Sequence, residues 1–308
     1  MANTKTIMRK CMETDKTKLL VTGASGQLGK ELVEMCSLSG LTVIGLDRGD
    51  ADITKSDEIK KLIIESGADA VIHCAAYTAV DRAEDERKLC YDINVNGTKH
   101  IAEACREVGA KMLYLSSDYV FNGSGKKPWK TTDQPDPVNY YGKTKYLGEL
   151  EVQKALDRYF IVRISWLYGH SGGNFVKTMV NLATKVDPET GSLRDRINVV
   201  DDQIGSPTNA LDLAKLLCEM IQTEKYGIYH ASNEGYCSWF EFASAIFALA
   251  GIKIKVNGIP SANYTAKAVR PKNSRLDKSS LTEMGFQRLP HWKDSLRRYL
   301  ETTTIYNN

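Results

Sequence analysis

Leu19–Gly29 reads LLVTGASGQLG and decides the fold of this 308-residue chain. It begins as a short apolar strand and continues into a helix, because Leu28, Leu32 and Met35 recur at the i, i+4 and i+7 spacing of a helical face. The first of its glycines permits a tight turn, the second lets backbone approach a pyrophosphate, and the third lets helix and strand pack closely. The free N–H groups at the helix start would face the phosphates. The stretch therefore predicts a dinucleotide-binding turn formed by Gly23, Ser25, Gly26, Gln27, Leu28 and Gly29.

Residues at the ends of the next two strands are expected to complete the cofactor site. Asp47 ends the second strand, where a carboxylate can bond both ribose hydroxyls of NADH. Arg48 follows and can instead hold the 2′-phosphate of NADPH. The two residues favour opposite cofactors, so we expect either NADPH or NADH. The expected lining also includes Asp52 and Ile53 near the adenine, and Ala75, Ala76 and Tyr77 at the end of the third strand.

Short apolar runs alternate with helical stretches along the chain. The runs lie at 19–21, 42–44, 70–72, 112–115, 160–162 and 197–200, and each is apolar enough to be buried on both faces, as parallel strands are. This alternation predicts an α/β fold, a Rossmann-type doubly wound parallel sheet with a smaller α-rich C-terminal lobe. In that lobe, Ser238 and Glu241 have the spacing of a capping box that starts a helix.

The same reading divides the chain into parts. We expect a flexible leader at 1–17 and an NAD(P)-binding domain at 18–170, onto which 197–231 folds back. A substrate-binding lobe is expected at 171–308. Within it, the polar, turn-rich segment 184–196 is expected to be an exposed loop.

Composition and charge argue against several function classes. With 41 Lys and Arg against 38 Asp and Glu, the net charge of +3 is too small to indicate nucleic acid or an anionic membrane as the partner. Seven scattered cysteines without a Cys-x-x-Cys pair indicate reduced thiols, and five histidines without His-x-x-x-His spacing offer no ligand set for a metal. No apolar run has the length of a signal peptide or a membrane span. We therefore expect a cytoplasmic protein.

Ser117, Tyr141 and Lys145 form a predicted proton-delivery group. Tyr141 and Lys145 are four residues apart, so they share a face on a helix. A free phenol has a pKa of about 10, and an ammonium about 4 Å away could lower this pKa by up to about three units before desolvation opposes the shift. Ser117 ends the fourth strand, at the sheet edge where open α/β sheets gather their ligands. The three residues indicate general acid–base catalysis beside the cofactor.

The chain resembles the extended short-chain dehydrogenase/reductases and, more closely, the dTDP-4-dehydrorhamnose reductases. The similarity runs from about Lys18 to Tyr299. It is carried by five stretches in order: Ser116–Phe121 (SSDYVF), Tyr140–Lys145 (YYGKTK), Arg163–Tyr168 (RISWLY), Asp202–Thr208 (DQIGSPT) and Arg270–Ser274 (RPKNS). The resemblance implies reduction of the 4-keto group of dTDP-4-dehydro-L-rhamnose to give dTDP-L-rhamnose. It also implies that Ser117 polarises the carbonyl, that Tyr141 protonates the forming alkoxide and that Lys145 holds the nicotinamide ribose.

The resemblance further implies a pocket for the nucleotide-sugar substrate. Asp118, Tyr119 and Trp166 would line the sugar pocket, and Gln203 and the Arg270 segment would face the nucleotide-sugar side. Asn174 is the amide kept in a Gly-Asn-Phe stretch that is similar to an Asn-Asn-Phe element of these reductases, and the loss of the other amide would alter sugar contacts. Ser117 stands where these reductases often have threonine, which keeps the hydroxyl.

Other function classes stay open. Nucleotide-sugar dehydratases and epimerases share the expected fold, but dehydratases carry an Asp-Glu pair where this chain has Asp118 and Tyr119. GDP-fucose synthase-like enzymes place a cysteine after the serine, unlike this chain. A non-catalytic subunit resembling the methionine adenosyltransferase β subunit can keep the tyrosine and lysine, and only the absence of turnover would identify it. A homodimer is also left open.

Overall fold

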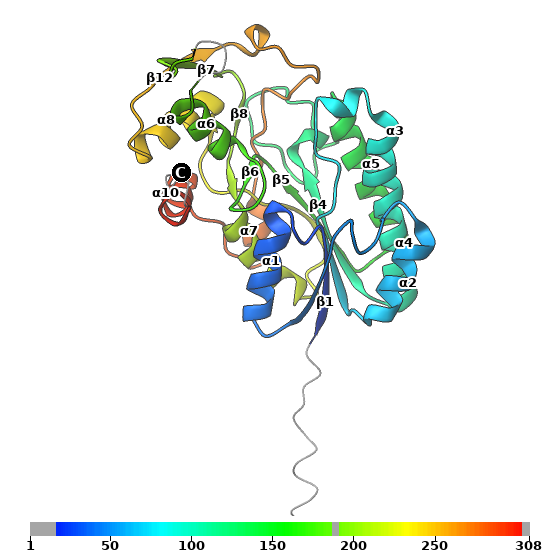
Figure 1. The fold of residues 1–308 in the computed structure, drawn as a ribbon. Helices are drawn as coiled ribbons and strands as arrows, with labels where there is room; N and C mark the ends of the chain where they lie inside the picture. The colour runs from blue at the N-terminus through cyan, green and yellow to red at the C-terminus, as the bar shows by residue number, and fades with distance from the viewer. Residues whose placement is uncertain (1–16, 187–190, 304–308) are drawn as a thin grey trace, which may run out of the picture.

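The computed structural model describes residues 17–186 and 191–303, and its centre is a six-stranded parallel sheet (Figure 1). The strand order is β10-β5-β4-β3-β1-β2. The chain passes from β1 outward to β2 and then crosses to β3, so the strand order reverses beside β1, where open α/β sheets bind ligands. The bounds are β1 Lys18–Thr22, β2 Thr42–Leu46, β3 Ala70–His73, β4 Lys111–Ser117, β5 Tyr159–Ile164 and β10 Gly227–His230. The predicted doubly wound fold is confirmed.

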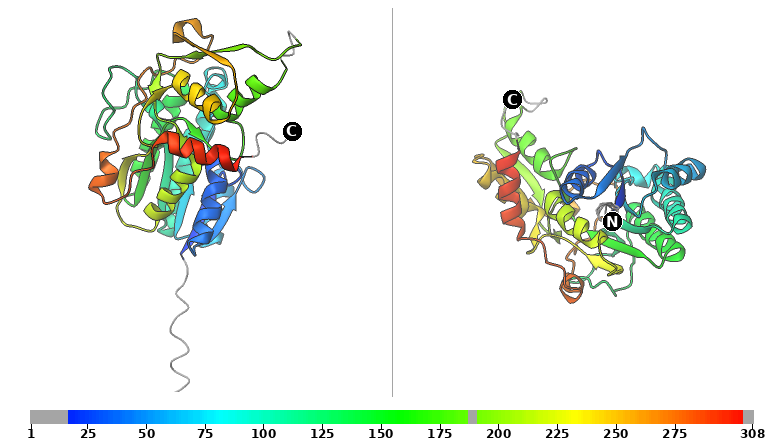
Figure 2. Two further views of the ribbon diagram at one scale, coloured as in Figure 1. Left: turned by 90° about the vertical axis from the view of Figure 1, so that its left-hand side faces the viewer. Right: turned by 90° about the horizontal axis from the view of Figure 1, so that it is seen from below.

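Helices cover both faces of this sheet (Figure 2). On one face, Leu32 and Leu213 pack against inward side chains of the strands, and on the other face Ile59, Ile101 and Val152 do the same. The strands are therefore buried on both sides, which explains their continuous apolar runs. The helices of the first face are α1 (Gln27–Leu38) and α7 (Ala210–Ile221), and those of the second are α2 (Ser56–Ser66), α4 (Thr98–Val108) and α5 (Tyr140–Ala155).

A second lobe with its own apolar core lies beside the carboxyl ends of the strands. Phe242, Trp292 and Tyr299 are among its buried side chains. The capping box of Ser238 and Glu241 forms as expected at the start of α8. The lobe contains α6 (Phe175–Thr184), β7 (Arg196–Val200), α8 (Trp239–Leu249), β12 (Lys255–Ile259) and α10 (Trp292–Thr302).

Short elements connect these layers. Two-residue strands pair as β6 with β9 and as β8 with β11. Their bounds are β6 Leu167–Tyr168, β8 Ile204–Gly205, β9 Thr208–Asn209 and β11 Cys237–Ser238. The short helices are η1 Arg82–Glu84, α3 Arg87–Tyr91, η2 Asp92–Gly97, η3 Asp118–Val120, η4 Ser261–Asn263 and α9 Ser279–Glu283.

The last predicted strand does not join the central sheet. Residues 197–200 lie in β7, which pairs with β12 in the second lobe. The side chains of β7 alternate between exposed and buried over its first residues, as in a strand that is covered on one face only. Within 197–231, it is α7 and β10 that return to the sheet, and Leu281 of α9 also packs into the core on the α1 face.

Two expected segments, the leader and the exposed loop, are only partly covered by the described residues. The leader at 1–17 lies outside them except for Thr17, and so do residues 187–190 of the expected loop. Within the described ranges, no helix is both long and apolar enough to cross a membrane.

Candidate active site

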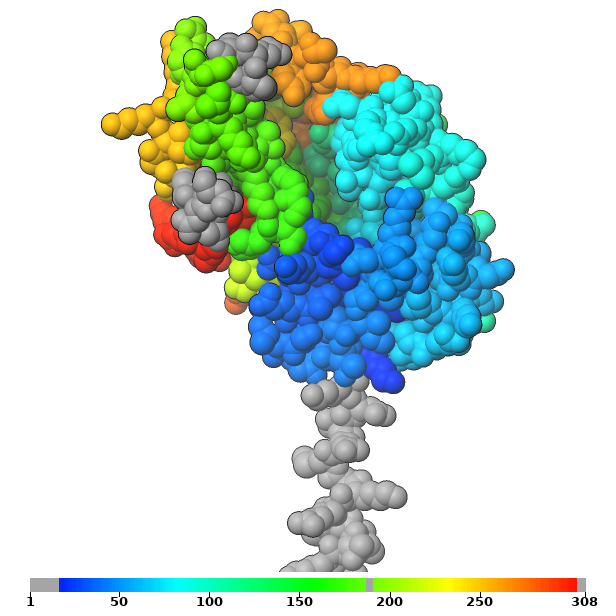
Figure 3. All heavy atoms as spheres, in the orientation of Figure 1, coloured from blue at the N-terminus to red at the C-terminus, as the bar shows by residue number. Residues whose placement is uncertain are grey.

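A cavity of about 870 Å³ lies at the carboxyl ends of β1 to β5. Figure 3 shows the surface hollowed between the second lobe and the part of the chain that carries α1. The predicted phosphate turn, the strand ends and the first turns of α5 all contribute to its wall, and Trp166, Leu167 and Gly173 close it from the side of the second lobe. The sequence predicted several wall residues at strand ends, but it missed Thr22, Cys74, Thr78, Leu115, Ser116 and Ile164, which end or follow the same strands.

The glycines of the turn leave no room for side chains. Gly23 has a φ of +69°, and a Cβ there would lie 2.9 Å from the backbone nitrogen of Ala75. A Cβ on Gly29 would lie 2.0 Å from the carbonyl oxygen of Gly23, so helix α1 could not approach β1 as it does. Gly26 is the N-cap of α1 and lines the cavity, so the free N–H groups of the first helical turn face the space that a pyrophosphate would take. This backbone fits a dinucleotide.

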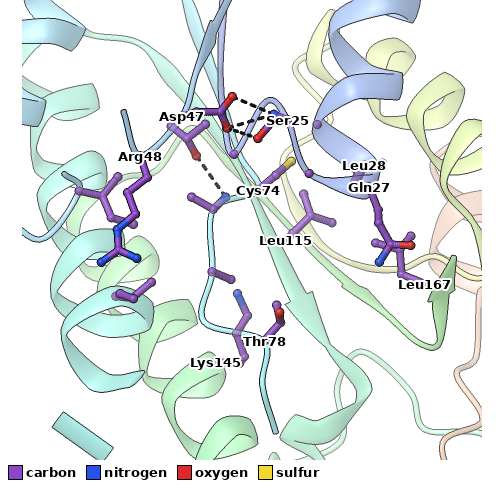
Figure 4. A pocket seen from close by; sticks show the side chains of 18 of the residues that line it. Ser25, Gln27, Leu28, Asp47, Arg48, Cys74, Thr78, Leu115, Lys145 and Leu167 are labelled. Atoms are coloured by element: carbon purple, nitrogen blue, oxygen red, sulfur yellow. Dashed lines mark hydrogen bonds between the residues drawn. The ribbon is translucent and has the colours of Figure 1, made fainter. Parts of the chain in front are cut away.

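Asp47 fastens the turn to the end of β2. Both of its carboxylate oxygens accept a hydrogen bond from the backbone N–H of Ser25 at 3.0 Å, and Oδ1 also accepts from the Ser25 hydroxyl at 2.9 Å (Figure 4). Arg48 lies on the opposite side of the same end of the cavity and its guanidinium extends along the wall. Asp52 and Ile53 also line this end, and Asp52 Oδ1 accepts hydrogen bonds from the backbone and side chain of Thr54.

Tyr77 is the expected cofactor residue that the structure places outside the cavity wall. Ala75 and Ala76 line the cavity, but the Tyr77 hydroxyl donates to Glu86 at 2.8 Å and its backbone N–H donates to Asn94 Oδ1 at 2.8 Å. Thr78, the residue after Tyr77, lines the cavity instead.

The three predicted catalytic residues converge on the cavity. Ser117 ends β4, while Tyr141 and Lys145 lie one turn apart on α5. The Asn139 side chain caps this helix by accepting from the backbone N–H of Gly142 at 2.8 Å. A Cβ on Gly142 would lie 2.1 Å from the carbonyl oxygen of Tyr119, so the glycine after Tyr141 lets α5 pack against the segment that follows Ser117.

Burial sets the electrostatics of this group. It raises the pKa of Tyr141, the charge of Asp118 raises it further, and a hydrogen bond with Ser117 lowers it in part. Burial lowers the pKa of Lys145 to about 7. The expected lowering of the Tyr141 pKa by Lys145 is therefore not found. The physical reason is that desolvation dominates both groups and that the ammonium lies 4.1 Å from the centre of the Tyr114 ring.

Asp118 is a buried carboxyl group next to Ser117 in the cavity wall. Its Oδ1 accepts from the Ser117 hydroxyl at 3.1 Å, while Oδ2 is buried without a hydrogen-bond partner. Burial raises the pKa of Asp118 to about 7, and the hydrogen bond from Ser117 lowers it only in part. The group therefore holds a proton into the neutral range.

Two predicted substrate residues lie close to this group. Tyr119 packs its ring edge-on against Tyr141, with ring centres 5.8 Å apart. Trp166 lines the cavity, has a φ of +49° and stacks on Trp239 with ring centres 3.7 Å apart. Trp239 had no signal in the sequence that would link it to the site.

Tyr119 is not part of the cavity wall, and the other three predicted substrate residues do not line the cavity either. Asn174 caps α6 by accepting from the backbone N–H of Lys177 and donates to Gln27 Oε1 at 3.2 Å, so it ties the second lobe to the phosphate turn. Gln203 is buried beside β8. Arg270 forms an ion pair with Asp81, a residue that sequence reasoning missed. In the described part of the chain, no group of three His, Cys, Asp or Glu side chains is arranged to hold a metal ion.

Comparisons with known proteins agree with this arrangement. The family model of the RmlD substrate binding domain matches residues 17–305. The chain is 40% identical to the spore coat polysaccharide biosynthesis protein SpsK of Bacillus subtilis, over 92% of this chain and 97% of that protein. It is 41% identical to a dTDP-4-dehydrorhamnose reductase of Streptomyces griseus, over 91% of this chain and 92% of the relative. A crystal structure of the dTDP-4-dehydrorhamnose reductase of Bacillus anthracis in complex with NADP superimposes with a TM-score of 0.89 at 43% identity, covering 94% of this chain and all of that one.

Proposed function

The chain belongs to the family of the RmlD substrate binding domain, and from that premise we propose that it reduces the 4-keto group of dTDP-4-dehydro-L-rhamnose to dTDP-L-rhamnose with NADPH or NADH. It is an oxidoreductase of nucleotide-sugar metabolism, like its relatives in Streptomyces griseus and Bacillus anthracis. The observation that carries the proposal is the convergence of Ser117, Tyr141 and Lys145 with the glycine turn on one cavity.

A bound nicotinamide cofactor supplies a hydride to the ketone carbon. The residues of this chain then have separate tasks. Ser117 donates a hydrogen bond to the ketone oxygen, and Tyr141 gives its proton to the alkoxide that forms there. Lys145 binds the ribose next to the nicotinamide. A proton transfer of this kind contributes about 100- to 10,000-fold to a rate.

The raised pKa of Tyr141 suits the direction of the reaction. A reduction needs the phenol in its protonated form, and burial keeps it protonated at neutral pH. An alkoxide is a much stronger base than a phenolate, so the transfer is downhill even from this weak acid. The buried phenol therefore carries its proton at neutral pH and is ready to donate it.

A dehydratase on this fold needs a second acid or base beside the ketone. Elimination of water next to a ketone requires one group to remove a proton and another to protonate the leaving hydroxyl. Asp118 is the carboxyl group at the substrate side of the cavity wall, and Tyr119 follows it, whereas Asp47 and Asp52 line the opposite, cofactor end. The residues thus favour reduction over dehydration.

The substrate test is a panel of keto-sugar nucleotides that includes dTDP-4-dehydro-L-rhamnose, assayed with NADPH and with NADH. We expect steady cofactor consumption and formation of dTDP-L-rhamnose. Turnover with a different 4-keto sugar alone would redirect the proposal to another nucleotide-sugar reductase. Tight cofactor binding without turnover on any member of the panel would support the non-catalytic subunit instead. The cytoplasmic location and the homodimer stay predictions.

A further inference from the structure

A fully buried ion pair lies behind the catalytic group, outside the cavity wall. Arg163 on β5 donates from Nε to Glu149 Oε1 at 2.9 Å and from Nη2 to Glu149 Oε2 at 2.7 Å. The two side chains are 2% and 0% exposed. Burying two charges costs much of what their attraction returns, and an apolar pair of similar volume is often as stable. The stability of the fold therefore does not explain this pair.

Glu149 reaches the end of the strand that carries Ser117. The Ser116 hydroxyl donates to Glu149 Oε1 at 2.5 Å. Ser116 also lies opposite Arg163 in the register of β4 and β5, so the carboxylate bridges two neighbouring strands at one level. The backbone of Ser116 leads directly to Ser117, whose hydroxyl faces the cavity.

Glu149 also lies one helical turn beyond Lys145 on α5. The titratable groups that face the Lys145 ammonium from the surrounding elements are His73, Cys74, Cys90, Tyr114 and Glu149. Burial lowers the pKa of His73 to about 3 and raises the pKa of both thiols, so these groups are neutral near pH 7. The carboxylate is the negative charge in this set, and it raises the pKa of Lys145 against the effect of burial.

Building on the proposed reductase function, we propose that Glu149 is a positioning residue: its buried carboxylate places a negative charge one helical turn from Lys145 and, through Ser116, fixes the strand end that presents Ser117. Arg163 holds the carboxylate in place. Its guanidinium lies over the Phe121 ring at 5.1 Å, and Phe121 is not part of the cavity wall.

The test removes the charge and keeps the shape. Glu149→Gln retains an oxygen that can accept from Ser116. The rate at which acetic anhydride acetylates Lys145 in the cofactor-free protein, followed by mass spectrometry from pH 5 to 10, reports how much of the amine is uncharged. We expect the midpoint in Glu149→Gln to fall by about one pH unit, a tenfold change in proton concentration. The alkaline fall of kcat should move to lower pH by the same amount.

Two further variants separate charge from position. Glu151→Gln makes the same chemical change two residues along α5, on the opposite face of the helix, and should leave the midpoint in place. Ser116→Ala breaks the hydrogen bond to Glu149 without changing any charge. It should lower kcat while leaving the Lys145 midpoint near that of the unmodified protein.

Glu149→Gln leaves Arg163 unpaired and buried, which can prevent folding. In that case Glu149→Gln with Arg163→Met replaces the pair by a neutral one, and the midpoint should still fall, because the lost carboxylate shares helix α5 with Lys145 whereas Arg163 holds it from β5. An unchanged midpoint in both variants, or an equal shift in Glu151→Gln or Ser116→Ala, would overturn the proposal. Failure of every keto-sugar nucleotide to react would refute the reductase function alone, because the labelling midpoint needs no substrate.

Discussion

Arg270 donates two hydrogen bonds to Asp81, from Nη1 to Oδ1 at 3.0 Å and from Nη2 to Oδ2 at 2.6 Å. Asp81 follows β3, while Arg270 lies in the segment after η4, and the backbone N–H groups of Lys267 and Ala268 donate to the same carboxylate. The next residue, Val269, accepts a hydrogen bond from the Asn139 side chain that caps α5. Asp81 therefore fastens the segment after η4 against the start of the catalytic helix.

Asp81→Asn should loosen this segment. An amide keeps one acceptor oxygen but loses the charge that holds Arg270, and both side chains are partly exposed, so we expect a loss of about 1 kcal/mol in the free energy of unfolding. KM for the nucleotide sugar should rise several-fold, because the loosened segment carries Arg270, a predicted substrate residue. The change in kcat should be smaller, because Asp81 is outside the cavity wall. Urea unfolding and steady-state kinetics measure both effects. Asp85→Asn is the control, since its pair with Lys267 is more exposed, and an equal effect there would contradict the role of Asp81.

Tyr141→Phe should lower kcat by about 100-fold or more and leave the dissociation constant of NADPH nearly unchanged. The hydroxyl gives the proton to the alkoxide, whereas the ring contact with Tyr119 survives in phenylalanine. Fluorescence titration and turnover assays give the two values. Tyr140→Phe is a matched control on the same helix, because its ring, which contacts Arg87, is kept. Full turnover in Tyr141→Phe would remove the tyrosine from the mechanism.

Asp118→Asn tests the buried carboxyl group through the pH dependence of stability. The folded protein keeps the Asp118 proton up to a pKa of about 7, whereas an unfolded chain releases it near pH 4. The folded state therefore binds more protons between these values, and its stability falls as the pH rises from about 4 to about 7. The full effect is roughly 4 kcal/mol at most.

The Asp118→Asn variant should lack this decrease. The stability of Asp118→Asn relative to the unmodified protein should rise across the same pH range, whatever the absolute effect of the new amide. Urea unfolding at several pH values measures the difference. Parallel curves for the two proteins would mean that Asp118 is ionised in the fold at pH 5.

The sequence predicted the parts of the site that depend on local pattern. The glycine turn, the strand end at Ser117 and the helical spacing of Tyr141 and Lys145 are encoded within short stretches, and the structure brings them to one cavity. The strand at 197–200 was assigned to the wrong sheet because a short apolar run does not reveal which partner it pairs with.

Other features depend on tertiary contacts that no local pattern contains. Asp81 and Arg270 are 189 residues apart, and Asn174 caps a helix while it holds Gln27 from a distance of 147 residues. The direction of the Tyr141 pKa shift could not be predicted from the sequence either. Spacing alone places a cation near the phenol, but the shift depends on how deeply both groups are buried.

Arg48→Ala should separate the two cofactors. Asp47 uses both carboxylate oxygens on Ser25, while Arg48 lies along the cavity wall at the same end, where its guanidinium can pair with a 2′-phosphate (Figure 4). A charge-assisted hydrogen bond of this kind is worth about 1.5–3 kcal/mol. We therefore expect kcat/KM for NADPH to fall by about 10- to 100-fold, while the value for NADH changes little.

The control for Arg48→Ala is Lys55→Ala, which removes a nearby exposed cation that pairs with Glu58 and is not part of the cavity wall. It should affect both cofactors slightly and equally, because an exposed charge outside the cavity wall is screened by solvent. Equal losses of kcat/KM with NADPH and NADH in Arg48→Ala would instead show that the arginine supports the β2 end of the cavity and does not bind the 2′-phosphate. A loss of kcat/KM with NADPH alone would mean that Arg48, and not Asp47, decides which cofactor this chain uses.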